Sequence, residues 1–201
     1  MRKLIFLLFL LPIFCFGQIK FAKKVVYPVV ANVAKLDFSK VANPASPSGW
    51  NRINYDGTLT TALVTPTGVS TGWSFVFNQA VSGDAGSNYE SGFPALGDPD
   101  FPDVAVRGLW YFDIAPNNIN ISFTGLNPSK TYNVLFAAYG QGSQDGLTVT
   151  LGGTTYTGSA FNNLYKPLFT ALVPNGSGVI SGTISRTTYY GVMSALIITE
   201  N

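Results

Sequence analysis

The 201-residue sequence contains no histidine and a single cysteine, Cys15. The Ser-His and Cys-His pairs that activate many hydrolytic nucleophiles are therefore excluded, and a zinc site would lack its preferred nitrogen and sulfur ligands. One cysteine cannot form a disulfide within the chain, so a hydrophobic core has to stabilise the fold. Charged residues make up only 11% of the sequence. These absences argue against most enzyme classes and predict a surface of uncharged polar side chains.

The N-terminus predicts an export signal. Arg2-Lys3 precedes an apolar run from Leu4 to Phe16, and Gly17 is the small residue that a signal peptidase needs. The run is shorter than the ~20 residues of a membrane-spanning helix. A lipid anchor on Cys15 is the alternative, but the bulky Phe14 before it is unfavourable. We expect residues 1–17 to be removed, leaving a mature chain without a membrane span in the periplasm, at the cell surface or outside the cell.

Charge is unevenly distributed along the rest of the chain. Five lysines lie between residues 18 and 40, whereas five basic residues face nine acidic residues beyond that point. The main part of the chain is therefore mildly acidic, which argues against nucleic-acid binding because phosphates need a basic face. The low charge and the 14% aromatic content also argue against a disordered chain.

Short segments rich in Val, Ile, Thr, Phe and Tyr follow one another, with Gly, Pro, Asn or Asp between them roughly every 8–12 residues. This pattern predicts an all-β fold, an antiparallel sandwich of nine or ten strands forming one domain over residues 33–201. Residues 18–32 are expected to form a leader or an edge strand. Eleven segments are candidates for these nine or ten strands: Val33–Phe38, Ala62–Val64, Gly72–Asn78, Ala105–Asp113, Asn120–Thr124, Thr131–Tyr139, Gly146–Leu151, Thr154–Thr157, Leu168–Val173, Gly178–Ser185 and Gly191–Thr199.

Three local features refine this prediction. Ile119, Ile121 and Phe123 alternate with polar residues and are expected to share one buried face. The run Thr131–Tyr139 is continuously apolar after its third residue, as in a central strand covered on both faces. The stretch Ala80–Asp103 is rich in Gly, Ser, Asp, Asn and Pro, so we expect a long loop of functional importance there.

Four motifs occur in a recognisable order. They are Leu36-Asp37-Phe38 before Trp50-Asn51, Phe101-Pro102-Asp103-Val104, the element Phe123–Tyr132, and the closing run Tyr190–Ile198. Together they resemble the galactose-binding-like jelly-roll modules of secreted Bacteroidetes proteins, which are often attached to glycan-degrading enzymes. The resemblance covers residues 33–199 and implies a jelly roll that binds carbohydrate. A fibronectin type III sandwich is the alternative fold, but it needs only ~90–100 residues.

The element Phe123–Tyr132 also has a structural interpretation. Gly125 permits a tight bend, Pro128 starts a turn, and Leu126 with Tyr132 can close one end of a sandwich. We expect the Tyr132 hydroxyl to find a backbone partner.

Carbohydrate binding requires an aromatic ring beside hydrogen-bonding side chains. Trp73, Trp110 and Tyr132 lie in strand patterns and are expected in the core, although adjacent Trp110 and Tyr111 must face opposite sides of a strand. Further candidates are the pair Asn162-Asn163 near Tyr165. The candidate ligand-binding residues are Trp50, Asn51, Arg52, Trp110, Tyr111, Tyr139, Gln141 and Asp145.

The main acidic cluster consists of Asp98, Asp100 and Asp103. A loop with several carboxylates suits Ca²⁺, and jelly-roll modules of the type that the chain resembles often hold a structural calcium ion, so these three residues are the candidate metal ligands. A plain solvated loop is the alternative, and Asp103 can instead cap the turn into a following strand. Nothing in the spacing establishes the two facing carboxyl groups that a glycosidase needs.

The sequence therefore predicts an exported binding module without enzymatic activity, with a glycan as its partner. The alternative is a structural or adhesive protein that uses the sandwich for protein contacts. The oligomeric state stays open.

Overall fold

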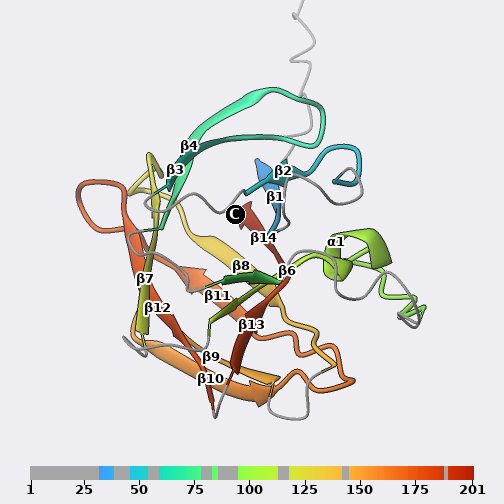
Figure 1. Cartoon of the computed structure of the whole chain (residues 1–201). Coiled ribbons are helices and arrows are strands. Elements are labelled where there is room, and N and C mark those ends of the chain that lie inside the picture. Colours follow the sequence, from blue (N-terminus) through green and yellow to red (C-terminus); the bar gives the residue numbers. More distant parts are fainter. Residues whose placement is uncertain are drawn as a thin grey trace, which may run out of the picture. The chain divides into compact units, whose positions relative to one another are not determined.

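A computed structural model describes residues 32–38, 46–53, 59–77, 83–85, 95–112, 118–141, 145–187 and 190–201. The predicted export signal and all but the last residue of the predicted leader lie outside these ranges. The described residues form two packed β-sheets (Figure 1), which confirms the predicted all-β sandwich. None of the helices in these ranges has the length and apolar character needed to span a bilayer.

The smaller sheet has five strands in the order β11-β8-β14-β1-β2. Its central strand β14 pairs antiparallel with both β8 and β1, whereas β1 and β2 run parallel over two residue pairs. The strands are β1 (Val33–Asp37), β2 (Asn51–Arg52), β8 (Tyr132–Ala137), β11 (Leu168–Leu172) and β14 (Ala195–Glu200).

The larger sheet has nine strands, eight of them in the order β3-β4-β7-β12-β9-β13-β6-β5, with β10 paired to β9. Most pairs are antiparallel, but β13 and β9 run parallel over two residue pairs. The sandwich is thus antiparallel, as predicted, apart from these two short parallel pairs. The strands are β3 (Leu59–Val64), β4 (Ser70–Phe77), β5 (Gly83–Ala85), β6 (Leu109–Phe112), β7 (Asn118–Thr124), β9 (Asp145–Leu151), β10 (Thr154–Ser159), β12 (Ile180–Ser185) and β13 (Tyr190–Met193).

The described part contains fourteen strands, more than the nine or ten predicted. Strands of two or three residues such as β2 and β5 are too short to show any periodicity. One of them, β5, lies inside the predicted long loop Ala80–Asp103 and pairs with β6.

The predicted strand Gly191–Thr199 is divided at Ser194, where the chain passes from the larger sheet to the smaller one. The backbone N–H of Ser194 donates to Ala137 O at 2.9 Å, and Ser194 O accepts from the N–H of Phe38 at 2.9 Å. The buried Ser194 Oγ accepts from the N–H of Tyr139 at 3.2 Å. These bonds satisfy the polar groups of a crossing point that lies wholly in the interior.

The predicted strand Ala105–Asp113 is wrong in its first part, because helix α1 spans Asp103–Arg107 and the strand β6 begins only at Leu109. Pro102 precedes the helix with a φ of −60°, and its carbonyl accepts from the Ala105 N–H at 2.8 Å. Ala105 and Val106 are both buried while Val104 is exposed. Two adjacent residues can face one apolar surface on a helix, whereas on a strand they point to opposite sides.

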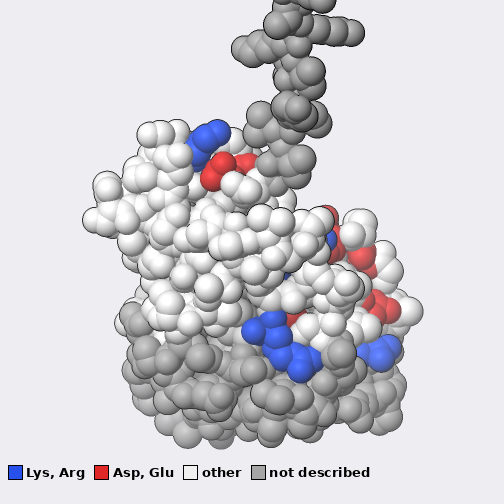
Figure 2. Space-filling view, turned by 90° about the horizontal axis from the view of Figure 1, so that it is seen from above, with Lys and Arg blue, Asp and Glu red and all other residues white. Residues whose placement is uncertain are grey.

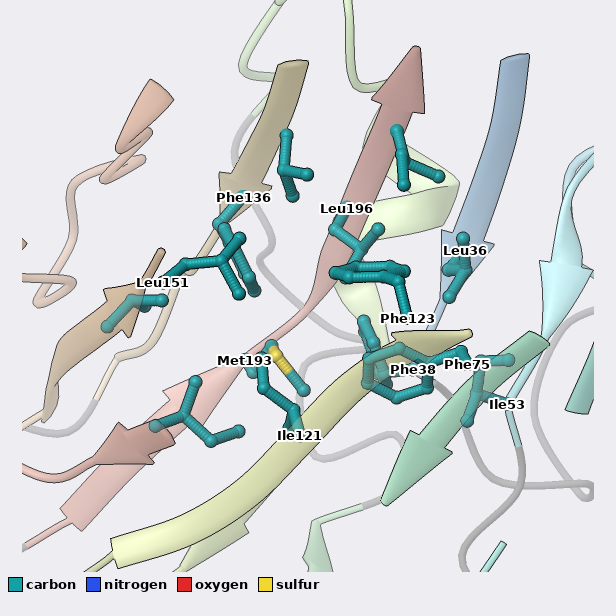
Figure 3. Close-up of a cluster of buried hydrophobic side chains, with 14 of the residues drawn as sticks. Leu36, Phe38, Ile53, Phe75, Ile121, Phe123, Phe136, Leu151, Met193 and Leu196 are labelled. Carbon is teal, nitrogen blue, oxygen red and sulfur yellow. The ribbon is translucent and has the colours of Figure 1, made fainter. Parts of the chain in front are cut away.

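The main core lies between the two sheets, and Figure 3 shows side chains from both sheets meeting there. Ile119, Ile121 and Phe123 alternate inward along β7, as predicted. The Trp110 ring lies 4.8 Å from that of Phe38 and 4.9 Å from that of Phe77 between centroids. Trp73, Trp110 and Tyr132 are buried, which confirms their expected place in the core.

The end of the sandwich near Tyr132 also forms as predicted. The Tyr132 hydroxyl accepts from the Asn127 N–H at 2.8 Å and donates to a Glu200 carboxylate oxygen at 3.1 Å. Gly125 has a φ of +75°, and a Cβ there would lie 2.3 Å from the Gly72 carbonyl oxygen. Glycine is therefore required both for the backbone conformation and for the close approach of the two segments.

Candidate functional site

A second apolar cluster covers the outer face of the smaller sheet. Phe101, Ala105 and Val106 from the α1 segment pack there with Ala137 of β8 and Ala195 of β14. The inner strand β8 is thus covered on both faces, as its continuous apolar run predicted. Five partly buried side chains border this cluster: Trp50, Leu96, Leu135, Leu164 and Ile197.

Trp50 lies half-buried at the margin of this cluster and is held from two sides. Its N–H donates to Pro47 O at 3.1 Å, closing a turn in which Gly49 has a φ of +80°. The Trp50 ring packs on Phe101 with 6.1 Å between centroids. The turn and the Phe101 contact therefore fix the position of an aromatic ring that remains partly exposed.

The neighbouring Asn51 anchors the same segment through its side chain. Its Nδ2 donates to Lys35 O at 3.0 Å and to Val64 O at 2.9 Å, and its Oδ1 accepts from the Val64 N–H at 2.9 Å. Arg52 Nε donates to Ser46 Oγ at 2.9 Å. The Asn51 amide is thus engaged by backbone groups of β1 and β3 and serves to hold Trp50 in place.

Trp50 and the acidic segment, which the sequence presents as separate candidates, are linked through the buried Phe101 ring. Lys35 Nζ is 5.5 Å from the Trp50 ring centroid, and Lys166 Nζ is 6.0 Å from the Phe101 ring centroid. Both distances fall within the range of cation–π contact. We call the side chains on either side of the buried Phe101 the Trp50 surface; it consists of Lys35, Trp50, Lys166, Asp98 and Asp100.

Lys166 connects two distant segments at this surface. Its Nζ lies 2.5 Å from Asp98 Oδ2 and 3.3 Å from Asp100 Oδ2. Asp98 Oδ1 also accepts from the backbone N–H groups of Asp100 and Phe101, each at 3.0 Å. Asp98 is mostly buried, whereas the Asp100 side chain is 48% exposed. The lysine thus orders residues 98–101 and leaves one carboxylate accessible to a ligand.

The pKa values of the Asp98–Lys166 pair reflect this contact. Burial raises the pKa of Asp98, but hydrogen bonds from Lys166, Phe101 and Asp100 outweigh it and leave the pKa below its ordinary 3.8. Burial lowers the pKa of Lys166, but the Asp98 and Asp100 carboxylates outweigh it and leave the pKa above its ordinary 10.5. Both groups are therefore charged over a wide pH range.

Replacing Lys166 by methionine is expected to lower the free energy of unfolding by about 1 kcal/mol at pH 7. Asp98 with a lowered pKa stabilises the fold above pH 3.8, and this contribution disappears as the pH falls through its folded-state pKa. Lys166 with a raised pKa stabilises it below pH 10.5, and this contribution disappears as the pH rises through its folded-state pKa. Urea denaturation from acid to alkaline pH measures the difference.

Lys130→Met is the matched control, because it removes a lysine from the turn after β7. An effect of Lys166→Met that equals the control, or that persists unchanged in strong acid, would contradict a stabilising ion pair.

Two candidate aromatic residues lie in the interior instead of at a ligand site. Trp110 and Tyr139 are each only 1% exposed, so both are core residues and neither ring offers a face to a ligand. Tyr111 and Asp145 belong to β6 and β9, and their side chains lie outside the described part of the structure. Gln141 is half-buried and follows Gly140, which bridges to Phe161.

The three candidate calcium ligands have separate roles in the structure. Asp98 and Asp100 contact the Lys166 ammonium, while Asp103 Oδ1 accepts from the Leu96 N–H at 3.0 Å and its residue begins α1. Within the described ranges, no three carboxylate, imidazole or thiol groups are placed to hold a metal ion. Calcium binding stays a prediction that this arrangement does not support.

Comparison with known proteins gives no family. No family model matches the sequence, and no curated protein does. Among solved structures, the ANX1 ectodomain from Arabidopsis thaliana matches at 10% identity with a TM-score of 0.46, over 85% of this chain and 50% of that one. Protein YXIM from Bacillus subtilis matches at 16% identity with a TM-score of 0.41, over 85% and 40%.

A third similar structure is the Podospora anserina GH26-CBM35 β-(1,4)-mannanase, at 15% identity and a TM-score of 0.32, over 73% of this chain and 28% of that one. The chain thus spans half or less of the length of these three structures. The similarities concern the coarse fold alone.

Proposed function

We propose that the protein is an exported, non-catalytic module that binds carbohydrate at the Trp50 surface. The observation that carries this proposal is the half-buried Trp50 ring, which packs on Phe101 and has the Lys35 ammonium group over it. Ring faces of this kind stack against the C–H groups of a sugar. The hydroxyl groups of the sugar need both hydrogen-bond donors and hydrogen-bond acceptors on the protein.

The polar groups of the Trp50 surface supply both kinds of partner. The Lys35 and Lys166 ammonium groups donate hydrogen bonds, and the exposed Asp100 carboxylate accepts them. Because Asp98 and Asp100 balance the two lysines, the surface has no net charge. Figure 2 shows that most of the described surface on the face it displays carries no charged side chain. A neutral glycan therefore fits this surface better than an acidic one.

The state of the carboxylates supports binding rather than hydrolysis. A glycosidase acid needs a raised pKa so that it can hold a proton at neutral pH. The pKa of Asp98 is lowered instead, because Lys166 and two backbone N–H groups stabilise the carboxylate. Asp98 therefore stays ionised and serves as a hydrogen-bond acceptor.

A glycan array with neutral and uronic-acid-containing oligosaccharides tests this function. We expect saturable binding to one or more neutral glycans, unaffected by a calcium chelator. Absence of binding to every glycan, or binding confined to acidic glycans, would overturn the proposal.

A further inference from the structure

The strand β10 presents an open sheet edge. Among the described residues it pairs with β9 alone, and all of its residues are exposed except the half-buried Gly158. Its sequence, Thr-Thr-Tyr-Thr-Gly-Ser, contains neither a charge nor a proline. The pairing with β9 also runs without a bulge. Edge strands normally carry a charge, a proline or a bulge, because each of these prevents an open edge from pairing with another strand.

The turn before β10 determines which backbone groups remain available. Gly152 and Gly153 form a two-residue turn with φ values of +56° and +83°, so Leu151 and Thr154 form the hydrogen-bonded pair that closes the hairpin. Hydrogen-bonded residues alternate along an antiparallel pair. Tyr156 therefore bonds to β9, whereas the N–H and C=O groups of Thr155 and Thr157 point away from it.

We propose that this edge pairs antiparallel with β10 of a second copy of the chain, about a two-fold axis at Tyr156. In this register Thr155 lies opposite the partner's Thr157, and their outward backbone groups form two hydrogen-bonded pairs. The two-fold axis makes the two pairs identical, and because residues 155 and 157 are both threonine, each pair places threonine opposite threonine.

The side chains of both faces agree with this register. On the outer face, Thr157 Oγ1 lies 3.0 Å from Thr148 Oγ1 and Thr155 Oγ1 lies 2.8 Å from Thr150 Oγ1. Pairing of two copies extends each of these hydroxyl pairs into a row of four threonines. Cross-strand Thr–Thr pairs of this kind stabilise sheets.

On the other face, Tyr156 is 40% exposed and packs edge-on against Phe169 at 4.9 Å between centroids. At the two-fold axis, Tyr156 lies opposite the partner's Tyr156 in a non-hydrogen-bonded position, where side chains are closest. The dimer thus covers apolar surface that one copy leaves in water. One strand per copy buries a small area, so the dimer is weak and reversible.

Sedimentation velocity over a concentration series tests the proposal. The protein is expected to show a reversible monomer–dimer equilibrium. The double variant Thr155→Lys/Thr157→Lys places like charges opposite each other and is expected to raise the dissociation constant at least ~10-fold. In the variant Thr155→Lys/Thr157→Glu each lysine faces a glutamate of the second copy, so the dimer is expected to persist.

The control variant Thr67→Lys/Val69→Lys adds the same charge to the exposed turn between β3 and β4 and is expected to leave the equilibrium unchanged. Near-UV circular dichroism confirms that each variant is folded. A wild-type protein that remains monomeric at every concentration would overturn the proposal. Equal dimerisation of the Lys/Lys and Lys/Glu variants would also overturn it.

Discussion

Replacing Trp110 by alanine is expected to lower the free energy of unfolding by about 3–5 kcal/mol. The ring is 1% exposed and lies between Phe38 and Phe77, with edge-to-face contacts to both. Removing it leaves a cavity between the Phe38 and Phe77 rings, which come from two separate segments, so the core cannot fill the cavity without moving the backbone. Guanidinium denaturation monitored by far-UV circular dichroism measures the loss.

Trp110→Phe is the graded control, because it keeps an aromatic ring in the cavity and should cost less than the alanine variant. Trp50→Ala is the second control, since it removes a ring that is only half-buried. If Trp50→Ala destabilised the fold as much as Trp110→Ala, the assignment of one ring to the core and the other to the surface would be wrong.

The second large effect is expected on binding. Trp50→Ala should weaken the affinity for a neutral glycan at least ~10-fold, because stacking of a sugar on a tryptophan buries apolar surface and is lost with the ring. Isothermal titration calorimetry with a glycan identified on the array measures this change. Lys35→Met should give a smaller loss, since it removes one donor beside the ring.

Phe161→Ala is the matched control for Trp50→Ala, because Phe161 is a 40% exposed aromatic residue outside the Trp50 surface. Its affinity for the glycan is expected to equal that of the wild type. If Phe161→Ala abolished binding and Trp50→Ala did not, the binding site would lie on the segment that pairs with Gly140, and the proposed site would be wrong.

The fold class was predictable because turn residues separate the strands and because the inward positions alternate. Ile119, Ile121 and Phe123 show this clearly, and the Tyr132 hydroxyl found the expected backbone partner. The division at Ser194 was not predictable from the sequence. The residues on both sides of it are buried in different sheets, so the sequence is equally apolar before and after Ser194.

Helix α1 was not predicted from the sequence, for a related reason. Val104, Ala105 and Val106 have the composition of a strand, and the feature that favours a helix is the burial of two adjacent residues on an apolar face. That face is supplied by Ala137 and Ala195, which lie far along the chain. Tertiary packing therefore overrides the local β preference.

The candidate site was predictable only in its parts. The motif around Trp50 and the acidic segment were both found in the sequence, but their proximity depends on Phe101 and on Lys166. The ion pair between Lys166 and Asp98 joins residues 68 positions apart, so no local sequence pattern predicts it. Trp110 and Tyr139 illustrate the opposite error, because an aromatic residue near a loop can equally fill the core.

Quenching of tryptophan fluorescence by acrylamide tests the central claim most directly. The chain has three tryptophans, and Trp73 and Trp110 are only 3% and 1% exposed, so Trp50 is the one that acrylamide should reach. Saturation with a neutral glycan is expected to protect this accessible fraction from quenching, in parallel with the binding isotherm. A glycan that binds without changing the quenching would show that the ligand lies elsewhere and would contradict binding at the Trp50 surface.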